Sequence, residues 1–129
     1  MFVAGTLVMA VAGMVAIEKI KSGDKVISTD PETMETSLKT VLETYIREVT
    51  TLVHLTVNGE EIVTTVDPPV LCKKIKALYK AGELIVGDEL LDVNGNILLV
   101  ENFDVELTDK PVKVYNFRWR ISILIMLAD

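Results

Sequence analysis

The sequence predicts an all-β domain built from a duplicated unit. Three observations support this prediction: short apolar runs rich in valine, isoleucine and threonine, two Asn-Gly pairs between such runs, and a segment that occurs twice. The chain has 129 residues, of which half are hydrophobic, so it is long enough to bury a sizeable core. We therefore expect a single domain that spans residues 1–129.

Two hairpins are predicted from the Asn-Gly pairs at positions 58–59 and 94–95. The first pair connects the apolar runs 52–57 and 61–66, and the second connects 90–93 to 97–100. Asn-Gly favours the two positive φ angles of a type I′ turn, which matches the twist of the flanking strands. Further strands are expected at residues 6–8, 26–28, 40–49 and 111–117.

One short segment, residues 73–81, is the helix candidate of the chain. The sequence Asp-Pro-Pro at 67–69 ends the strand before it, because proline cannot donate a backbone hydrogen bond within a sheet.

An internal repeat is visible in the sequence. Residues 20–27 (Ile-Lys-Ser-Gly-Asp-Lys-Val-Ile) resemble residues 84–91 (Leu-Ile-Val-Gly-Asp-Glu-Leu-Leu), 64 positions later, and residues 42–57 resemble residues 100–116. Two collinear matches are hard to attribute to chance similarity among strands. The repeat, roughly 17–57 and 81–117, predicts two equivalent halves related by a pseudo-two-fold axis.

The composition argues against several kinds of function. With 13 basic and 19 acidic residues the formal charge is −6, which does not fit a nucleic-acid-binding surface. A single cysteine and a single histidine leave no internal disulfide framework and no Cys-rich or His-rich metal site. We expect no cofactor, no metal and no nucleic-acid partner.

The uncharged stretch 2–17 has an alternative interpretation as a membrane segment. It is slightly shorter than the about 20 apolar residues that a spanning helix needs, and Gly5, Thr6 and Gly13 interrupt it. It also lacks the basic start of a signal peptide. We favour a buried strand at 6–8 followed by a glycine turn, with no membrane partner and a cytoplasmic location.

Blocks of residues in collinear order over nearly the whole chain carry a family resemblance. They are Phe-Val-Ala-Gly-Thr-Leu-Val at 2–8 with Gly-Asp at 23–24, Thr-Thr-Val-Asp at 64–67, Lys-Ala-Gly-Glu-Leu at 80–84 with Gly-Asp at 87–88, and Val-Lys-Val-Tyr-Asn-Phe at 112–117. The chain resembles the Hint (hedgehog/intein) domain family, and bacterial intein-like and pretoxin Hint domains in particular. This resemblance implies a duplicated, twisted, horseshoe-like all-β fold.

The resemblance also implies autocatalytic chemistry, in which an N-terminal Cys or Ser attacks the preceding carbonyl. This chain has Met1 at that position, and a thioether cannot attack a carbonyl carbon productively. Thr65 of the second block is present, but Pro68 stands where the family has a histidine, and proline has no proton to donate. Arg-Trp-Arg-Ile-Ser-Ile at 118–123 replaces the late block with its Asp and His. We expect no catalytic residue, and Met1, Thr65 and Pro68 are vestigial family positions.

Three other side chains have simple structural explanations. Cys72 lies beside two lysines that lower a thiol pKa, but no histidine is near it in sequence. His54 lies between Val53 and Leu55 in a predicted strand, where successive side chains point to opposite faces. We therefore expect His54 on the face opposite those two residues, as a structural or surface residue. Asp67 and Thr65 suit a turn.

The genetic code suggests an origin for the altered C-terminal segment. One permitted coding of residues 118–129, read from the third base, gives Val-Glu-Asp-Phe-His-Thr-Tyr-Tyr-Val-Gly-Gly, which is the late block that the resemblance leads us to expect. A shift in the codons of residues 70–72 similarly gives Phe-Tyr, which commonly follows the second block. We therefore predict that frameshifts produced a degenerate Hint domain.

The sequence thus predicts a Hint domain that no longer processes itself and is not an active enzyme. The main alternative is a β-rich binding or homo-oligomeric assembly module with apolar ends as its interface. A residual self-cleaving enzyme that uses Thr65, and a fragment anchored in a membrane through residues 2–17, are two further alternatives. A β-prone altered C-terminal strand also favours a homodimer, including one with exchanged segments.

Overall fold

The computed structural model describes residues 1–30, 33, 35–67, 69–72, 77–91 and 96–118. Most of them lie in antiparallel strands, and two short 3-10 helices, η1 (Ile17–Lys19) and η2 (Ala81–Glu83), complete the regular structure of these residues. The strands are β1 (Phe2–Val3), β2 (Leu7–Ala10), β3 (Gly13–Ala16), β4 (Lys25–Thr29), β5 (Thr36–Thr40), β6 (Glu43–Val57), β7 (Glu60–Thr64), β8 (Pro69–Cys72), β9 (Ala77–Lys80), β10 (Glu89–Leu91) and β11 (Ile97–Arg118). The predicted all-β class is confirmed.

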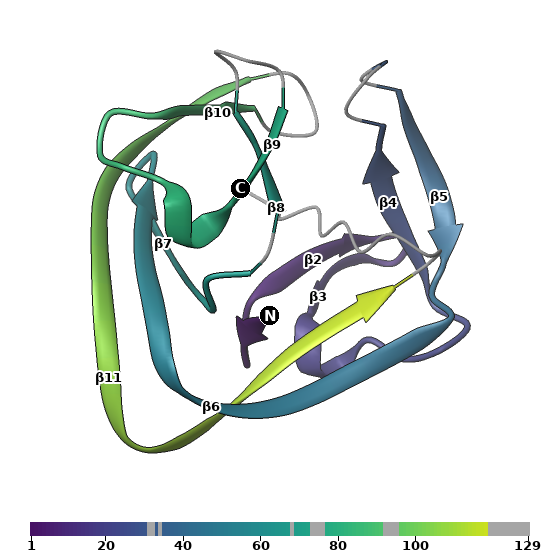
Figure 1. Cartoon of the computed structure of the whole chain (residues 1–129). Coiled ribbons are helices and arrows are strands. Elements are labelled where there is room, and N and C mark those ends of the chain that lie inside the picture. Colours follow the sequence, from purple (N-terminus) through teal and green to yellow (C-terminus); the bar gives the residue numbers. More distant parts are fainter. Residues whose placement is uncertain (31–32, 34, 68, 73–76, 92–95, 119–129) are drawn as a thin grey trace.

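The strands form two sheets. A seven-stranded sheet has the order β1-β7-β6-β11-β10-β8-β9, with β1 also paired to β11, and a four-stranded sheet has the order β3-β2-β4-β5. Figure 1 shows that the long strands β6 and β11 curve around the N-terminus, with β7 to β10 on one side of it and β2 to β5 on the other. This arrangement is the predicted twisted horseshoe.

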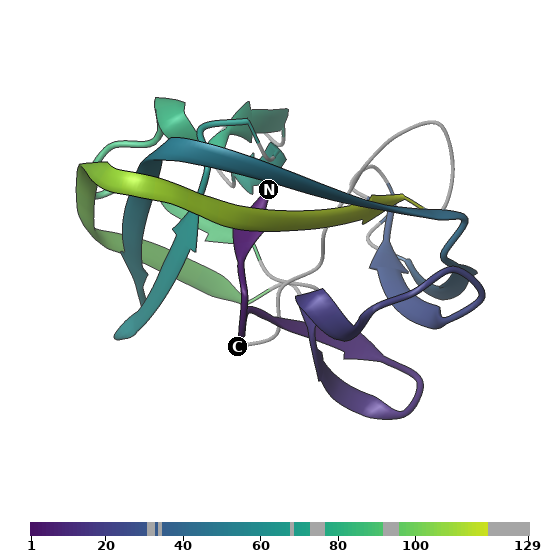
Figure 2. The ribbon, with the colours of Figure 1, turned by 90° about the horizontal axis from the view of Figure 1, so that it is seen from below.

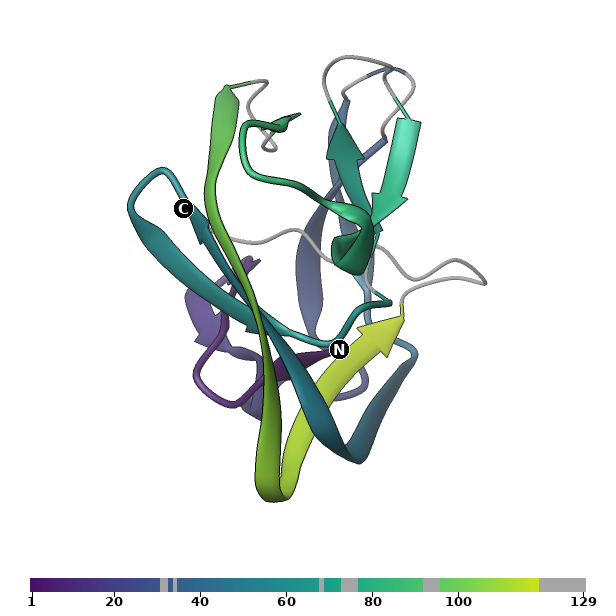
Figure 3. The same ribbon diagram turned by 60° about the vertical axis from the view of Figure 1, so that its left-hand side comes forward.

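The β6–β11 pair spans both parts of the molecule (Figures 1 and 2). Its register runs from Val57 opposite Val100 to Glu43 opposite Arg118, with irregularities between Val100 and Asn102 and between Leu107 and Val112. Both strands bend strongly along their length (Figure 3). Irregular pairing of this kind increases the local twist of the strands. The same two-stranded ribbon can therefore extend through two parts of the molecule that are oriented differently.

The first half contains a Gly-Asp turn after η1. The Lys21 N–H donates to Asp24 Oδ2 at 3.0 Å, and Gly23 has a φ of +93°, a conformation that favours glycine. The Gly23 N–H donates to the Val41 carbonyl at 2.8 Å, and the Val41 N–H returns a bond of 2.8 Å to the Asp24 carbonyl.

The second half repeats this turn after η2. The Ile85 N–H donates to Asp88 Oδ2 at 2.9 Å, and Gly87 has a φ of +97°. Gly87 and Asp88 exchange two backbone bonds with Val100, of 2.8 and 2.9 Å, as Gly23 and Asp24 do with Val41. The same hydrogen bonds at equivalent positions confirm the predicted duplication.

Each half has its own buried apolar cluster. One cluster lies mainly among β1, β2, η1 and β4 and also includes Phe117, and the other includes Val53, Leu55 and Val57 of β6 together with Leu84 and Val100. Alternation along β6 places every second residue of 53–57 inside, as a strand with one solvated face requires. The first cluster buries Val8, so the predicted buried strand in the uncharged N-terminal stretch is confirmed.

The local predictions have mixed outcomes. Asn58 and Gly59 adopt φ angles of +48° and +81°, so the first Asn-Gly hairpin is confirmed, whereas the turn at 94–95 lies outside the described residues. The predicted helix at 73–81 is wrong where it can be examined, because residues 77–80 form β9 and pair with β8. Pairing with β8 outweighs the modest helix propensity of Ala-Leu-Tyr-Lys.

Within the described residues, no helix has the length and apolarity to cross a membrane.

Candidate functional site

The chain enters the seven-stranded sheet at β1, directly after residue 1. Phe2 pairs with Thr64 of β7 on one side and with Tyr115 of β11 on the other, and Val3 pairs with Val114. The Phe2 side chain is buried in the first apolar cluster. Burial of Phe2 and pairing of β1 on both edges therefore hold Met1 at the end of β7.

Residues 64 and 65 bind the backbone of Met1 through three hydrogen bonds. The Met1 amino nitrogen donates to Thr65 Oγ1 at 2.9 Å, the Thr65 N–H donates to the Met1 carbonyl at 2.8 Å, and Thr64 Oγ1 donates to the same carbonyl at 2.7 Å. Thr64 and Thr65 are both buried. We call this arrangement of Thr64 and Thr65 around residue 1 the cradle.

The cradle is an unfavourable place for positive charge. Burial lowers the pKa of the Met1 amino group from 8.0 to about 5, the nearby Asp67 carboxylate opposes this shift, and Arg47 adds to it. Arg47 and Asp67 form an exposed ion pair with 3.6 Å between Nη2 and Oδ2. At neutral pH the nitrogen of residue 1 is therefore largely uncharged beside the Thr65 hydroxyl.

The loop that follows the cradle is anchored on η2. The Gly82 N–H donates to the Val66 carbonyl at 3.1 Å. A Cβ atom on Gly82 would lie 2.7 Å from Val66 Cβ and 3.2 Å from Val66 Cα, which is closer than side chains tolerate. Glycine is therefore required at position 82 so that the loop can pack closely enough to hold Thr65 in place.

The structure brings together two of the three family positions that the sequence analysis singles out. Met1 and Thr65 are in direct contact, with Asp67 nearby, whereas Pro68 lies outside the described residues. Cys72 lies in β8, and β6, β11 and β10 separate that strand from β7 in the order of the sheet. The sequence singled out Met1 and Thr65 through the family resemblance alone, and the structure shows that they are in contact.

His54 lies on the face of β6 opposite Val53 and Leu55, as predicted. Its ring contacts two carboxylates, of Glu61 and Glu106, and not the cradle.

Sequence reasoning missed two participants in the site. The sequence places Thr64 in a strand and in the second family block but assigns no role to its hydroxyl, which donates to the Met1 carbonyl. Arg47 lies 18 residues before Thr65 in the sequence, and only the curvature of β6 brings it to Asp67. Two adjacent threonines at the end of a strand were the available signal, because each hydroxyl can donate or accept a hydrogen bond at a neighbouring backbone group.

The model of one protein family matches residues 7–120, and its description is the pretoxin HINT domain. The chain belongs to this family. The match covers most of the chain and includes both Gly-Asp turns and the cradle residues Thr64 and Thr65. No curated protein matches this HINT domain.

Solved structures of bacterial intein-like domains and inteins resemble this HINT domain. The solution structure of a bacterial intein-like domain from Clostridium thermocellum is 50% identical, with 99% of this chain and 97% of that chain covered and a TM-score of 0.89. A splice-inactive variant of the AceL NrdHF class 3 split intein is 16% identical, with 90% and 83% covered and a TM-score of 0.76. The gp41-1 intein is 18% identical, with 91% and 86% covered and a TM-score of 0.70. The last two likenesses concern the fold alone.

The chemistry available at the cradle is limited by the side chain at residue 1. A hydroxyl beside the nitrogen of residue 1 can accept or share a proton, and two donors on the Met1 carbonyl hold the backbone in one orientation. The methionine thioether supplies no nucleophile. Within the part of the chain that the structure describes, no group of three or more His, Cys, Asp and Glu is placed to hold a metal ion.

Gly82→Ala is expected to destabilise the domain by about 1–3 kcal/mol, because the new methyl group forces Val66 and its loop away from η2. Chemical denaturation measures this loss, and the Thr65 amide resonance should shift with it. Val66→Gly removes the side-chain atoms nearest to the new methyl group. Gly82→Ala should therefore lower the free energy of unfolding by less in the Val66→Gly background than in the unaltered chain. An equal cost in both backgrounds would contradict this account of the loop.

Proposed function

We propose that this chain is a HINT domain that keeps the family fold and the cradle but has lost autoprocessing. The observation that carries the proposal is the occupant of the cradle. Thr64 and Thr65 bind the backbone of residue 1 through three hydrogen bonds, and the residue bound there is a methionine. Geometry that orients a backbone cannot cleave it when no side chain is able to attack the preceding carbonyl.

The surroundings of the cradle support the same proposal. Acyl transfer also needs a group that protonates the departing nitrogen, and Pro68, at the position of the family histidine, cannot donate a proton. Thr65 Oγ1 is 2.9 Å from that nitrogen, but an unperturbed threonine hydroxyl is a weak acid. Sequence 118–123 contains neither Asp nor His, so it supplies no second proton donor.

The proposal is tested with a reporter domain fused upstream of Met1. The fusion is incubated with thiol, and its intact mass is followed over time. We expect the unaltered chain to remain whole, and Met1→Cys combined with Pro68→His to release the reporter, because the cradle still orients the bond that precedes residue 1. Adding Thr65→Val to that pair should abolish the release.

Release of the reporter by the unaltered chain would overturn the proposal. Cys72→Ala and Thr65→Val would then identify which residue carries the chemistry. A repaired variant that folds but stays whole would show that the cradle no longer presents the bond to residue 1.

We propose that the loss arose through frameshifts in the gene. The coding argument for residues 118–129 supports this origin, because the unique codons of Trp119 and Met126 fit the shifted frame. The nucleotide sequence provides the test, and we expect it to encode Val-Glu-Asp-Phe-His when it is read from the third base of the Arg118 codon. Codons that are incompatible with that frame would contradict the proposed origin.

Assembly with a second copy is a second candidate function, favoured by the outward face of the four-stranded sheet. Met9 pairs with Met14, Ile27 pairs with Leu38, and Ala10 pairs with Val26, so Met9 lies beside Ile27. These four apolar side chains form one row across β3, β2, β4 and β5, and Met14 and Leu38 are 48% and 51% exposed. An apolar row on an exposed sheet is typical of an interface.

Light scattering over a concentration series tests the assembly. We expect a dimer that dissociates in Leu38→Glu, because a carboxylate at the β5 end of the row opposes apolar contact. Thr40→Glu, on the same strand but beyond the row, should leave the dimer intact. A monomer at all concentrations would exclude this candidate.

A further inference from the structure

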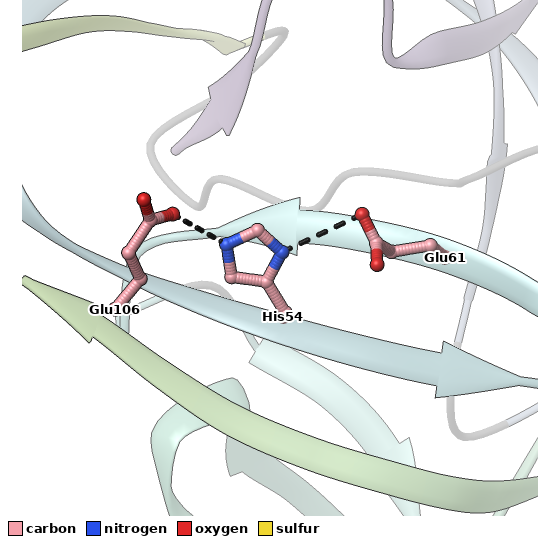
Figure 4. Close-up of polar contacts among 3 residues, drawn as sticks. All are labelled: His54, Glu61 and Glu106. Carbon is pink, nitrogen blue, oxygen red and sulfur yellow. Dashed lines mark hydrogen bonds and ion pairs between the residues drawn. The ribbon is translucent and has the colours of Figure 1, made fainter. Parts of the chain in front are cut away.

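His54 connects three strands on the solvated face of the seven-stranded sheet. Its Nε2 atom lies 2.7 Å from Glu106 Oε1 of β11, and its Nδ1 atom lies 3.4 Å from Glu61 Oε1 of β7. Figure 4 shows the imidazole between the two carboxylates, with one carboxylate at each ring nitrogen. Only a protonated imidazole carries N–H groups at both nitrogens, so only the charged ring can donate to both carboxylates at once.

Three acidic side chains face this histidine. Asp104 of β11 is directly opposite His54 in the register, and Glu106 and Glu61 lie one position further along the same face on β11 and β7. The paired segments 52–57, 60–64 and 100–107 contain no lysine or arginine. His54 is therefore the cation available to these three carboxylates within the paired segments.

Loss of the His54 proton changes this face from a set of ion pairs to a group of like charges. With the ring uncharged, Glu61 on β7 and Asp104 and Glu106 on β11 flank β6, and no lysine or arginine of the paired segments offsets their mutual repulsion. The hydrogen bond to Glu106, and secondarily the contact with Glu61, raise the pKa of His54 above its ordinary value of 6.5.

Among the three strands, β7 depends most on this contact. It pairs with β6 through five residues, but with β1 through Thr64 alone. Strand β11, in contrast, pairs with β6 along almost its whole length. The C-terminal end of β7 is Thr64, so any loosening of this strand reaches the cradle directly.

We propose that His54 is a proton-operated clamp that sets how firmly β7 holds the cradle on residue 1. The protonated ring ties Glu61 of β7 and Glu106 of β11 to β6 and keeps Thr64 and Thr65 on the Met1 backbone. The neutral ring releases Glu61 and leaves the carboxylates to repel one another, and β7 opens more often. This inference does not depend on whether the domain processes itself, because it concerns the cradle and not its chemistry.

The direction of the pH dependence follows from the raised pKa. The folded state binds the His54 proton more tightly than the unfolded state does. The stabilisation is therefore fully present below about pH 6.5, the ordinary histidine pKa, and is lost as the pH rises through the folded-state pKa.

Amide hydrogen exchange, measured by NMR and expressed as protection factors, tests the clamp at about pH 5.5 and about pH 8.5. The informative probe is the Thr65 N–H, which donates to the Met1 carbonyl. In the unaltered chain its protection should fall by about fivefold between the two conditions, as expected for one or two exposed ion pairs. In His54→Gln it should be low at both.

The matched variants separate the clamp from other titrations. Glu61→Gln and Glu106→Gln should each shrink the pH-dependent change, Glu61→Gln because it removes the contact of the ring with β7, and Glu106→Gln because it removes the hydrogen bond that most raises the pKa of His54. Glu60→Gln removes a neighbouring β7 carboxylate that faces away from the ring, and it should behave like the unaltered chain. The Met1 amino group titrates equally in all of these variants, so it cancels in the comparison.

Equal pH-dependent changes in the unaltered chain, His54→Gln and Glu106→Gln would overturn the clamp. Should His54→Gln fail to fold, the two glutamate variants decide the question. A loss of protection that is the same at both pH values in those variants would identify an ordinary structural contact and would also contradict the proposal.

Discussion

The continuous pairing of β6 with β11 is the constraint on which the rest of the structure depends. Each of these strands belongs mainly to one half of the duplicated chain, and their pairing joins the halves. The Gly-Asp turn in each half forms backbone bonds with Val41 or Val100, close to where each long strand begins. The ribbon is thus held near both ends, while its middle is left free to twist and bend.

The duplication is symmetric in its turns but not in its functional site. The cradle forms where Phe2, which precedes the first repeat, pairs with Thr64, which lies between the two repeats. Residue 1 lies at this junction, so its backbone exchanges hydrogen bonds with two residues that are more than 60 positions away in the chain. Such a site tolerates a change of side chain at residue 1, because Thr64 and Thr65 bind backbone atoms.

This separation explains how a HINT domain can lose its chemistry and keep its fold. The bonds from Thr64 and Thr65 require no particular side chain at residue 1, and burial of Phe2 holds β1 in the sheet. Stability of the fold therefore depends on Phe2 and Gly82. Autocatalytic cleavage depends on a nucleophile and a proton donor, and we propose that this chain has lost both. Selection on one set of residues can relax without affecting the other.

Local patterns in the sequence predicted the all-β class, many of the strands, the first Asn-Gly turn and the duplicated Gly-Asp turns, because alternation and glycine placement are local properties. The same local reasoning predicted a helix at 73–81 and was wrong for residues 77–80, where pairing with β8 decides the conformation. Only the tertiary structure placed Arg47 beside Asp67 and Glu106 beside His54, since the curvature and register of β6 and β11 bring these residues together. No local pattern encodes register over so long a ribbon, and so the cradle and the histidine contact emerge only when the halves pair.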